Sequence, residues 1–144
     1  MLVSQVLRSK ADDGVLTIRP GAPVAEAARV MSERRVGSLV VSVDGRHAVG
    51  ILSERDVVRE IGRTGAACLS EPVSRYMTAD IVTCRRGDRA DDVLALMTTG
   101  RFRHLPVVED DELVGLVSIG DVVKARLGEL ATERDALEGM IKGF

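Results

Sequence analysis

Two serine–aspartate pairs with identical spacing are the residues of this chain best suited to bind a ligand. Ser53 precedes Asp56, Ser118 precedes Asp121, and each Ser follows a short apolar run that begins with glycine. A Ser followed three residues later by an acid is a capping box, which satisfies backbone amides at a helix start. The same helix end can hold a phosphate, while an ionised Asp accepts hydrogen bonds from ribose hydroxyls. The pairs leave two interpretations open, a structural cap and a nucleotide contact.

Both pairs lie inside a longer internal repeat. Residues 50–59, GILSERDVVR, return 65 positions later as residues 115–124, GLVSIGDVVK. Further matches precede these segments in both copies, with one residue dropped at the turn of the second copy. The segments that precede the two copies also correspond, since residues 3–7 resemble residues 73–77. A duplication on this scale predicts two copies of one folding unit that fill nearly the whole chain.

Each copy has the pattern of a strand, a helix, two strands and a second helix. The expected strands are residues 15–18, 39–43 and 48–52 in the first copy and residues 81–84, 105–108 and 113–117 in the second. Apolar residues spaced i, i+3, i+4, i+7 predict a helix after the first strand of each copy, from Val24 and from Ala90. Ser53 and Ser118 are expected to open the second helices. The nearly all-apolar hairpin strands predict sheets covered on both faces.

A unit of roughly 60 residues buries only a modest share of its surface alone, so we expect the two copies to pack together into one domain. Its expected parts are a first repeat at residues 1–62, a linker at 63–72, a second repeat at 73–126 and a C-terminal helical extension at 127–144.

The last helix is expected to run from Asp121 to about Lys142. Its apolar residues are spaced by alternating 4 and 3, with Arg134 interrupting the stripe: Val123, Leu127, Leu130, Leu137 and Ile141. This is the spacing of a coiled-coil seam. A stripe that extends beyond the domain needs a cover, and a second subunit is the simplest one. We therefore expect a homodimer; the alternative is that the helix folds back on its own domain.

The composition argues against several classes of partner. A net charge of -2 gives no electrostatic footprint for nucleic acid, and 2% aromatic residues supply no base-stacking platform. No apolar run is long enough for a membrane span and the first residues lack a signal-peptide core, which predicts a cytoplasmic protein. Cys68 and Cys84 are too few for a disulfide framework or a zinc site, so two reduced, partly buried thiols are expected.

Catalytic patterns fail on inspection. The segment from Gly115 to Gly120 has the glycine spacing of a phosphate loop, but Asp121 and Val122 stand where Lys and Ser or Thr are needed. No nucleophile, base and orienting group can be assembled from the few titrating residues. His47, beside a turn, is expected to face solvent. We expect no enzyme activity, no metal and no required cofactor.

The doubled pattern resembles the cystathionine beta-synthase (CBS) domain pair, also called a Bateman module. Residues 35–41 with 50–58, and residues 101–108 with 115–123, carry the likeness, which covers about residues 3–126. The resemblance implies a mixed α/β fold, a tandem pair of β-α-β-β-α units packed about a pseudo-twofold axis. It also implies two clefts between the units that can bind adenine nucleotides or related adenosyl ligands.

The resemblance also implies which residues line the clefts. In that family the Ser or Thr and the Asp of the last motif contact phosphate and ribose, and the first strand and an L-P-V-V strand line the base pocket. Carried over, these residues are Thr17, Gly37, Ser53 and Asp56 in the first copy, and Thr83, His104, Pro106, Ser118 and Asp121 in the second. Arg55 and Arg103, each present in one copy only, are candidate phosphate contacts, with solvated surface as the alternative.

We therefore expect a regulatory module that holds an adenosine-containing nucleotide such as AMP, ATP or an NAD-type dinucleotide as a regulatory ligand. Binding would bias the arrangement of repeats, which an unidentified protein partner would read. The alternative is a structural or interaction CBS pair with no physiological nucleotide, in which the Ser–Asp pairs are caps only. An enzyme acting on the bound nucleotide is the third hypothesis.

Overall fold

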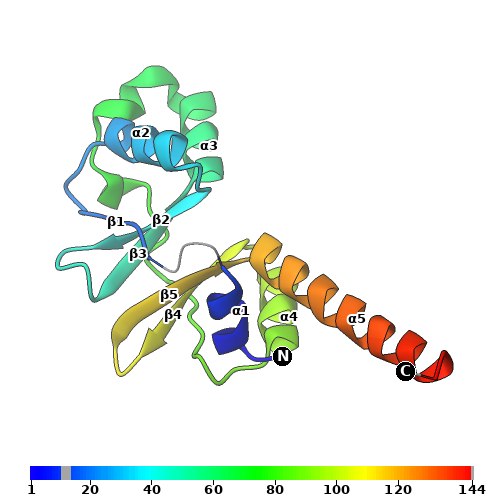
Figure 1. The fold of residues 1–144 in the computed structure, drawn as a ribbon. Helices are drawn as coiled ribbons and strands as arrows, with labels where there is room; N and C mark the ends of the chain where they lie inside the picture. Colours follow the sequence, from blue (N-terminus) through cyan, green and yellow to red (C-terminus); the bar gives the residue numbers. More distant parts are fainter. Residues whose placement is uncertain (11–13, 144) are drawn as a thin grey trace.

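Two strand hairpins, each backed by helices, meet in the middle of the molecule (Figure 1). The computed structural model describes residues 1–10 and 14–143. In chain order the elements are α1 (Val3–Ser9), β1 (Thr17–Ile18), α2 (Val24–Arg34), β2 (Ser38–Ser42), β3 (Ala48–Ser53), α3 (Glu54–Thr64), the 3-10 helices η1 (Gly65–Ser70) and η2 (Val73–Arg75), α4 (Ala90–Gly100), β4 (His104–Glu109), β5 (Glu112–Ser118) and α5 (Ile119–Ile141). The expected mixed α/β fold with an extended last helix is confirmed.

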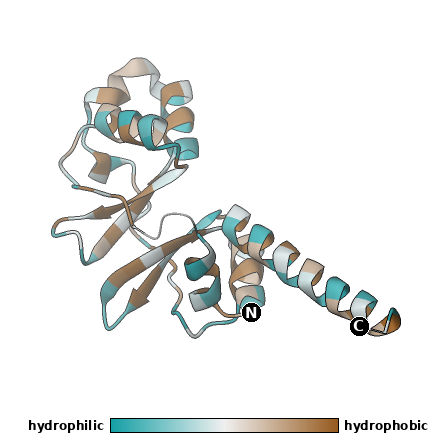
Figure 2. Ribbon diagram, in the orientation of Figure 1, coloured by the Kyte–Doolittle hydropathy of each residue, from teal (hydrophilic) through white to brown (hydrophobic). Residues whose placement is uncertain are grey.

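The first repeat contains a three-stranded sheet in the order β1-β2-β3. Strand β1 runs parallel to β2 and pairs Thr17 with Val40, while β2 and β3 form the expected antiparallel hairpin. Every residue of β2 is buried. Figure 2 shows the hydrophobic character of both hairpins. Strands β3 and β5 alternate between buried and partly exposed residues, so among the described strands only β2 is covered on both faces along its whole length.

The second repeat departs from the expected pattern at its first strand. Residues 81–84 form no strand, and only an isolated parallel bridge joins Cys84 to Val107. In the first repeat the Val40 amide donates to the Leu16 carbonyl across 3.2 Å. Proline occupies the corresponding position 106 and has no amide hydrogen, so this ladder bond cannot form. The prediction of a strand over residues 81–84 is therefore wrong.

The segments that precede the repeats are exchanged between two hydrophobic cores. Val3 and Val6 of α1, which lead into the first repeat, pack in the core of the second repeat with Val93 and Leu105. Val73 of η2, which leads into the second repeat, packs in the core of the first. The exchange ties the two repeats into one unit, and it explains why residues 3–7 and 73–77 match.

A matching glycine in each repeat allows these exchanged segments to approach. A Cβ atom at Gly50 would lie 2.5 Å from the Met77 Sδ atom, and one at Gly115 would lie 2.8 Å from a Leu7 methyl carbon. Side chains do not fit at such distances, which is why the repeated motif begins with glycine in both copies.

Helix α5 leaves the body of the domain and ends far from it (Figure 1). Its apolar stripe is exposed along its whole length: Leu127 is 62% exposed, Leu137 59% and Ile141 85%. The alternative that this helix folds back on its own domain is therefore wrong. Among the described residues, no helix combines the length and the apolar character that crossing a bilayer requires.

Candidate functional site

Both Ser–Asp pairs form complete capping boxes. The Ser53 hydroxyl accepts a hydrogen bond from the Asp56 amide at 3.2 Å, and the Asp56 carboxylate accepts one from the Ser53 amide at 2.9 Å. Ser118 and Asp121 repeat this geometry at the start of α5, with distances of 3.0 and 2.9 Å. The structural interpretation of the pairs is correct. Each box uses the Oδ2 atom of its Asp in the cap, and both Asp residues line a cleft.

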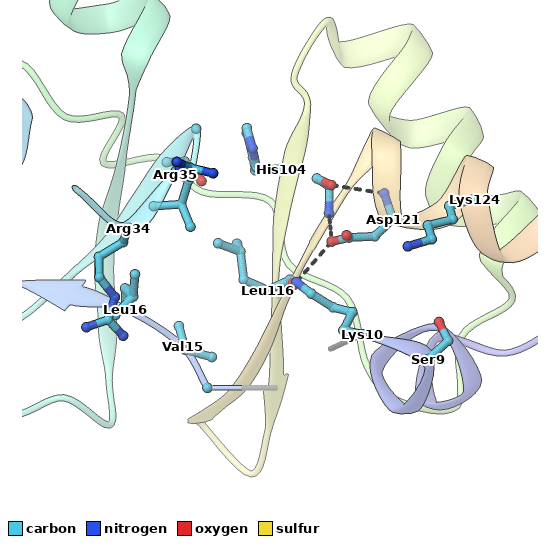
Figure 3. Close-up of a pocket in the computed structure, with 15 residues that line it drawn as sticks. Ser9, Lys10, Val15, Leu16, Arg34, Arg35, His104, Leu116, Asp121 and Lys124 are labelled. Carbon is cyan, nitrogen blue, oxygen red and sulfur yellow. Dashed lines mark hydrogen bonds and ion pairs between the residues drawn. The ribbon is translucent and has the colours of Figure 1, made fainter. Parts of the chain in front are cut away.

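A first cleft, here called cleft 1, lies between the two repeats and has a volume of about 400 Å³. One wall comes from the first repeat and the other from the second (Figure 3). Its lining residues are Ser9, Lys10, Gly14, Val15, Leu16, Arg34, Arg35, Val36, Gly37, Ser38, His104, Leu116, Ser118, Asp121 and Lys124. The volume falls within the range of small-molecule sites. Cleft 1 thus combines the Ser–Asp pair of the second repeat with the residues just before β1 and the first residue of β2 in the first repeat.

Asp121 is the acidic centre of cleft 1. Its Oδ2 atom lies 3.0 Å from the Lys10 ammonium, which also donates to the Leu116 carbonyl at 2.7 Å (Figure 3). Burial raises the pKa of Asp121, but hydrogen bonds from Ser118 and the Lys10 charge outweigh burial and hold the pKa below its usual value. The carboxylate is therefore ionised at neutral pH, as an acceptor of ribose hydroxyls must be.

The mouth of cleft 1 is strongly cationic. Arg34 and Arg35 reach it from the end of α2, and Lys124 reaches it from the first turns of α5 (Figure 3). None of these three side chains forms an ion pair with any residue in the described ranges 1–10 and 14–143. They are therefore available to neutralise an anionic ligand.

A second cleft, cleft 2, is related to the first by the pseudo-twofold axis and has a volume of about 370 Å³. It combines the Ser–Asp pair of the first repeat with the end of α4 and the start of β4 in the second. Its lining residues are Ile51, Ser53, Arg55, Asp56, Arg59, Thr78, Gly100, Arg101, Phe102, Arg103 and His104.

The acid of cleft 2 is held by a different cation. Asp56 pairs with Arg59 of its own helix at 2.9 Å, and the same guanidinium lies 3.6 Å from the Glu60 carboxylate. In cleft 1 the partner of the acid, Lys10, instead comes from the chain just after α1. The two clefts have one backbone plan but different charge arrangements.

Eight of the eleven predicted site residues line a cleft. Cleft 1 contains Gly37, His104, Ser118 and Asp121, and cleft 2 contains Ser53, Arg55, Asp56, Arg103 and His104. Thr17, Thr83 and Pro106 line neither. Thr17 sits in the β1 ladder one residue beyond Leu16, Thr83 precedes the bridge at Cys84, and Pro106 is buried in β4. Each cleft draws its lining from both repeats, which a comparison of repeat sequences does not reveal.

Several lining residues escaped the sequence reasoning. Lys10 belongs to no repeated motif, so only the fold brings it to Asp121. Arg35 and Arg101 occupy equivalent positions after α2 and α4, and both have left-handed backbones, with φ of 55° and 57°. The repeated Arg at the end of a helix was the available signal. Ser38 is 2% exposed and lines cleft 1, and within the described part of the chain its hydroxyl has no hydrogen-bond partner.

Comparison with known proteins agrees with this architecture. The family model described as CBS domain matches residues 3–63 and 73–128. The crystal structure of a CBS-domain containing protein from Agrobacterium tumefaciens has a TM-score of 0.83 at 40% identity, covering 88% of this chain and 99% of that one. The mitochondrial CBS domain-containing protein CBSX3 of Arabidopsis thaliana is 35% identical over 148 residues, which cover 98% of this chain and 72% of that protein.

A more distant likeness shares the fold. The CBS domain pair of protein MJ0100, solved in complex with 5′-methylthioadenosine and S-adenosyl-L-methionine, has a TM-score of 0.78 at 21% identity and covers 90% of this chain and 98% of that one. A tandem of two β-α units about a pseudo-twofold axis, with a cleft on each side, defines a CBS pair. The chain belongs to the CBS domain family and contains two copies of the domain.

Proposed function

We propose that this protein is a regulatory module that binds an adenosine-containing ligand in each of its two clefts. The observation that carries the proposal is the position of the two acids. Asp56 and Asp121 each sit at a helix start, face a cleft of suitable size and have unpaired cations opposite. An ionised acid beside a cationic helix start suits a ribose attached to a phosphate.

The parts of such a ligand have separate positions in cleft 1. Asp121 accepts hydrogen bonds from the vicinal ribose hydroxyls, and Arg34, Arg35 and Lys124 neutralise phosphate oxygens. The purine lies against the apolar wall formed by Val15 and Leu16, where backbone groups can form hydrogen bonds with its edge. Supporting this assignment, the related CBS pair of MJ0100 holds two adenosyl ligands.

The proposed output is a change in the arrangement of the two repeats. Each cleft has walls from both repeats, so a ligand that binds one arrangement better shifts the population toward it. An unidentified protein partner would respond to that arrangement. The proposed function is therefore ligand binding and signalling, with the nucleotide as a regulatory ligand.

The proposed assembly is a homodimer formed through α5. Its exposed residues Leu127, Leu130 and Leu137 keep the alternating spacing of a coiled-coil seam, and this seam is self-complementary because a second copy presents the same stripe. Leu127, Leu130 and Leu137 line neither cleft.

A thermal-shift screen on nucleotide-stripped protein tests the binding proposal. AMP, ADP, ATP and NAD are the probes, and a ligand at a hundredfold excess over its Kd adds about 2.7 kcal/mol of stability. We expect a rise in Tm with at least one probe, a smaller rise in Asp56→Ala and in Asp121→Ala, and none in the double variant. Asp91→Ala is the matched control, since Asp91 lies in the first turn of α4 and lines neither cleft.

The complete capping boxes favour one competing function, a structural or interaction CBS pair without a physiological nucleotide. In that case both acids serve only to start helices. A flat thermal response to all four probes, with both Asp variants merely less stable than the wild type, would support this alternative and contradict our proposal.

A further inference from the structure

One side chain, His104, is shared by the two clefts. It lines cleft 1 and cleft 2, and no other residue in the described part of the chain lines both. His104 opens strand β4, directly opposite Ser118 in the antiparallel ladder. Its ring packs against the first repeat, since a Cβ atom at Gly37 would lie 3.4 Å from both the Cε1 and Nε2 atoms. The imidazole is therefore a wall between two ligand sites.

The internal repeat explains why only one residue is shared. The counterpart of His104 in the first repeat is Ser38, which opens strand β2 opposite Ser53. Ser38 lines cleft 1 only, because its short side chain does not extend to cleft 2. The imidazole extends further and reaches both. The pseudo-twofold symmetry is broken at this pair of positions.

While it is neutral, the His104 ring can donate a hydrogen bond to only one ligand. Burial lowers the pKa of His104, and Lys10 and Arg103 lower it further, while Asp121 and Glu54 act in the opposite direction. A neutral imidazole has one N–H donor and one acceptor nitrogen. Neither ring nitrogen forms a hydrogen bond within the described residues, so the donor is free for a ligand.

The proposed ligands compete for this group. The phosphate and ribose oxygens of a nucleotide are acceptors, and both ligands carry negative charge toward the same ring. If the N–H turns toward the ligand in cleft 1, the ligand in cleft 2 faces an acceptor nitrogen, and the reverse holds as well. The second ligand to arrive therefore binds less favourably than the first.

We infer that His104 couples the two clefts antagonistically, so that a nucleotide bound in one cleft weakens nucleotide binding in the other. This inference rests on the proposed function. By thermodynamic linkage the effect is reciprocal, and couplings of this kind change affinity by about 5- to 150-fold. The protein would then respond over a broader range of nucleotide concentration than the same two clefts would without coupling.

Calorimetry with AMP as the probe tests the coupling. The affinity of cleft 1 alone is measured in Asp56→Ala and that of cleft 2 alone in Asp121→Ala. For independent sites, the product of these two association constants equals the overall constant of the wild type. We expect the wild-type constant to fall short of the product by at least about fivefold. The same three measurements in a His104→Ala background should show no shortfall.

His47→Ala is the matched control, because His47 is exposed, lines neither cleft and should leave the shortfall unchanged. A wild-type constant equal to the product would overturn the inference, and so would a shortfall that persists without His104. Both results would leave the proposed function standing, since AMP would still bind. If AMP does not bind, the probe with the largest thermal shift replaces it, and absence of binding by AMP, ADP, ATP and NAD alike would overturn the proposed function and the coupling with it.

Discussion

The two repeats build the same cleft twice but hold its acid differently. Asp121 of cleft 1 is paired with Lys10, which the chain delivers from beyond α1, whereas Asp56 of cleft 2 is paired with Arg59, one turn further along its own helix. Helix α3 ends at Thr64, whereas α5 continues to Ile141. Duplication thus fixes the backbone plan, while single substitutions and one extended helix make the two copies different.

Substitutions in α5, the helix that only the second repeat extends, should change the oligomeric state of the protein. Replacing two stripe residues, Leu130→Glu and Leu137→Glu, should convert a dimer to a monomer, because charges in a coiled-coil seam lose their hydration on association. Light scattering coupled to size exclusion measures the change. Glu133→Gln, on the same helix but off the stripe, is the control. A wild-type protein that is already monomeric, or a variant that remains dimeric, contradicts the proposed assembly.

The equivalent glycines should differ in the free energy of unfolding. A Cβ at Gly50 would lie 3.0 Å from the Thr78 carbonyl oxygen as well as close to Met77, and the Thr78 backbone is fixed by hydrogen bonds to Ile51. The three atoms nearest to a Cβ at Gly115 all belong to the flexible Leu7 side chain. We expect Gly50→Ala to cost about 3 kcal/mol and Gly115→Ala about 1 kcal/mol. Urea denaturation provides the values.

Gly62→Ala is the control for this pair, since Gly62 lies in α3 with open space around it. It should be neutral or stabilising by up to about 1 kcal/mol. Equal losses at Gly50 and Gly115 would mean that the approach of Thr78 does not distinguish the two repeats.

The cations beside the two acids should differ in how much they contribute to phosphate binding. Lys124 of cleft 1 has no ion pair within the described residues, whereas its counterpart Arg59 is engaged by Asp56 and Glu60. Lys124→Met, made in the Asp56→Ala background, should weaken ATP binding about fivefold, corresponding to about 1 kcal/mol for an exposed charge pair, and leave adenosine binding unchanged. Competition calorimetry resolves the two ligands. An equal loss for both ligands would argue for damage to the fold instead of a lost phosphate contact.

His104, which has no titrating counterpart in the first repeat, should give a small pH dependence of thermal stability. The folded-state pKa of His104 lies below its usual value of 6.5, because burial disfavours the charged ring. Its contribution to stability is therefore fully present above pH 6.5 and is lost as the pH falls below 6.5 toward the folded-state pKa.

His104→Asn, which keeps a polar group but does not titrate, should lose less thermal stability between pH 7.5 and pH 5 than the wild type. Calorimetric Tm values at the two pH values measure the difference. An identical fall in Tm in both proteins would show that titration of His104 does not contribute to the loss of stability at low pH.

Local features of the fold were predictable from sequence because their causes are local. The capping boxes follow from Ser and Asp spacing, and the hairpins follow from apolar runs that flank short turns. The missing strand at residues 81–84 depends on one absent amide at Pro106, whose effect appears only once the register is known. Pro106, at a position expected to pair with residues 81–84, is the sequence signal against a strand there.

The composition of the clefts was predictable only in part. The acids and their serines carry a repeated signature, but the opposite walls come from the other repeat and depend on how the repeats pack. Lys10 is separated from Asp121 by more than 100 residues, and the shared position of His104 arises from the pseudo-twofold axis. Contacts between residues on opposite sides of that axis depend on the tertiary structure and cannot be seen in the repeat sequences.

Counting the nucleotides bound to each chain shows whether both clefts are ligand sites. Native mass spectrometry of stripped protein with excess AMP should show two nucleotides per chain in the wild type, one per chain in Asp56→Ala and in Asp121→Ala, and none in the double variant. A wild-type chain that retains neither AMP nor any of the other three probes, or single variants that still retain two nucleotides, would contradict the two-site proposal.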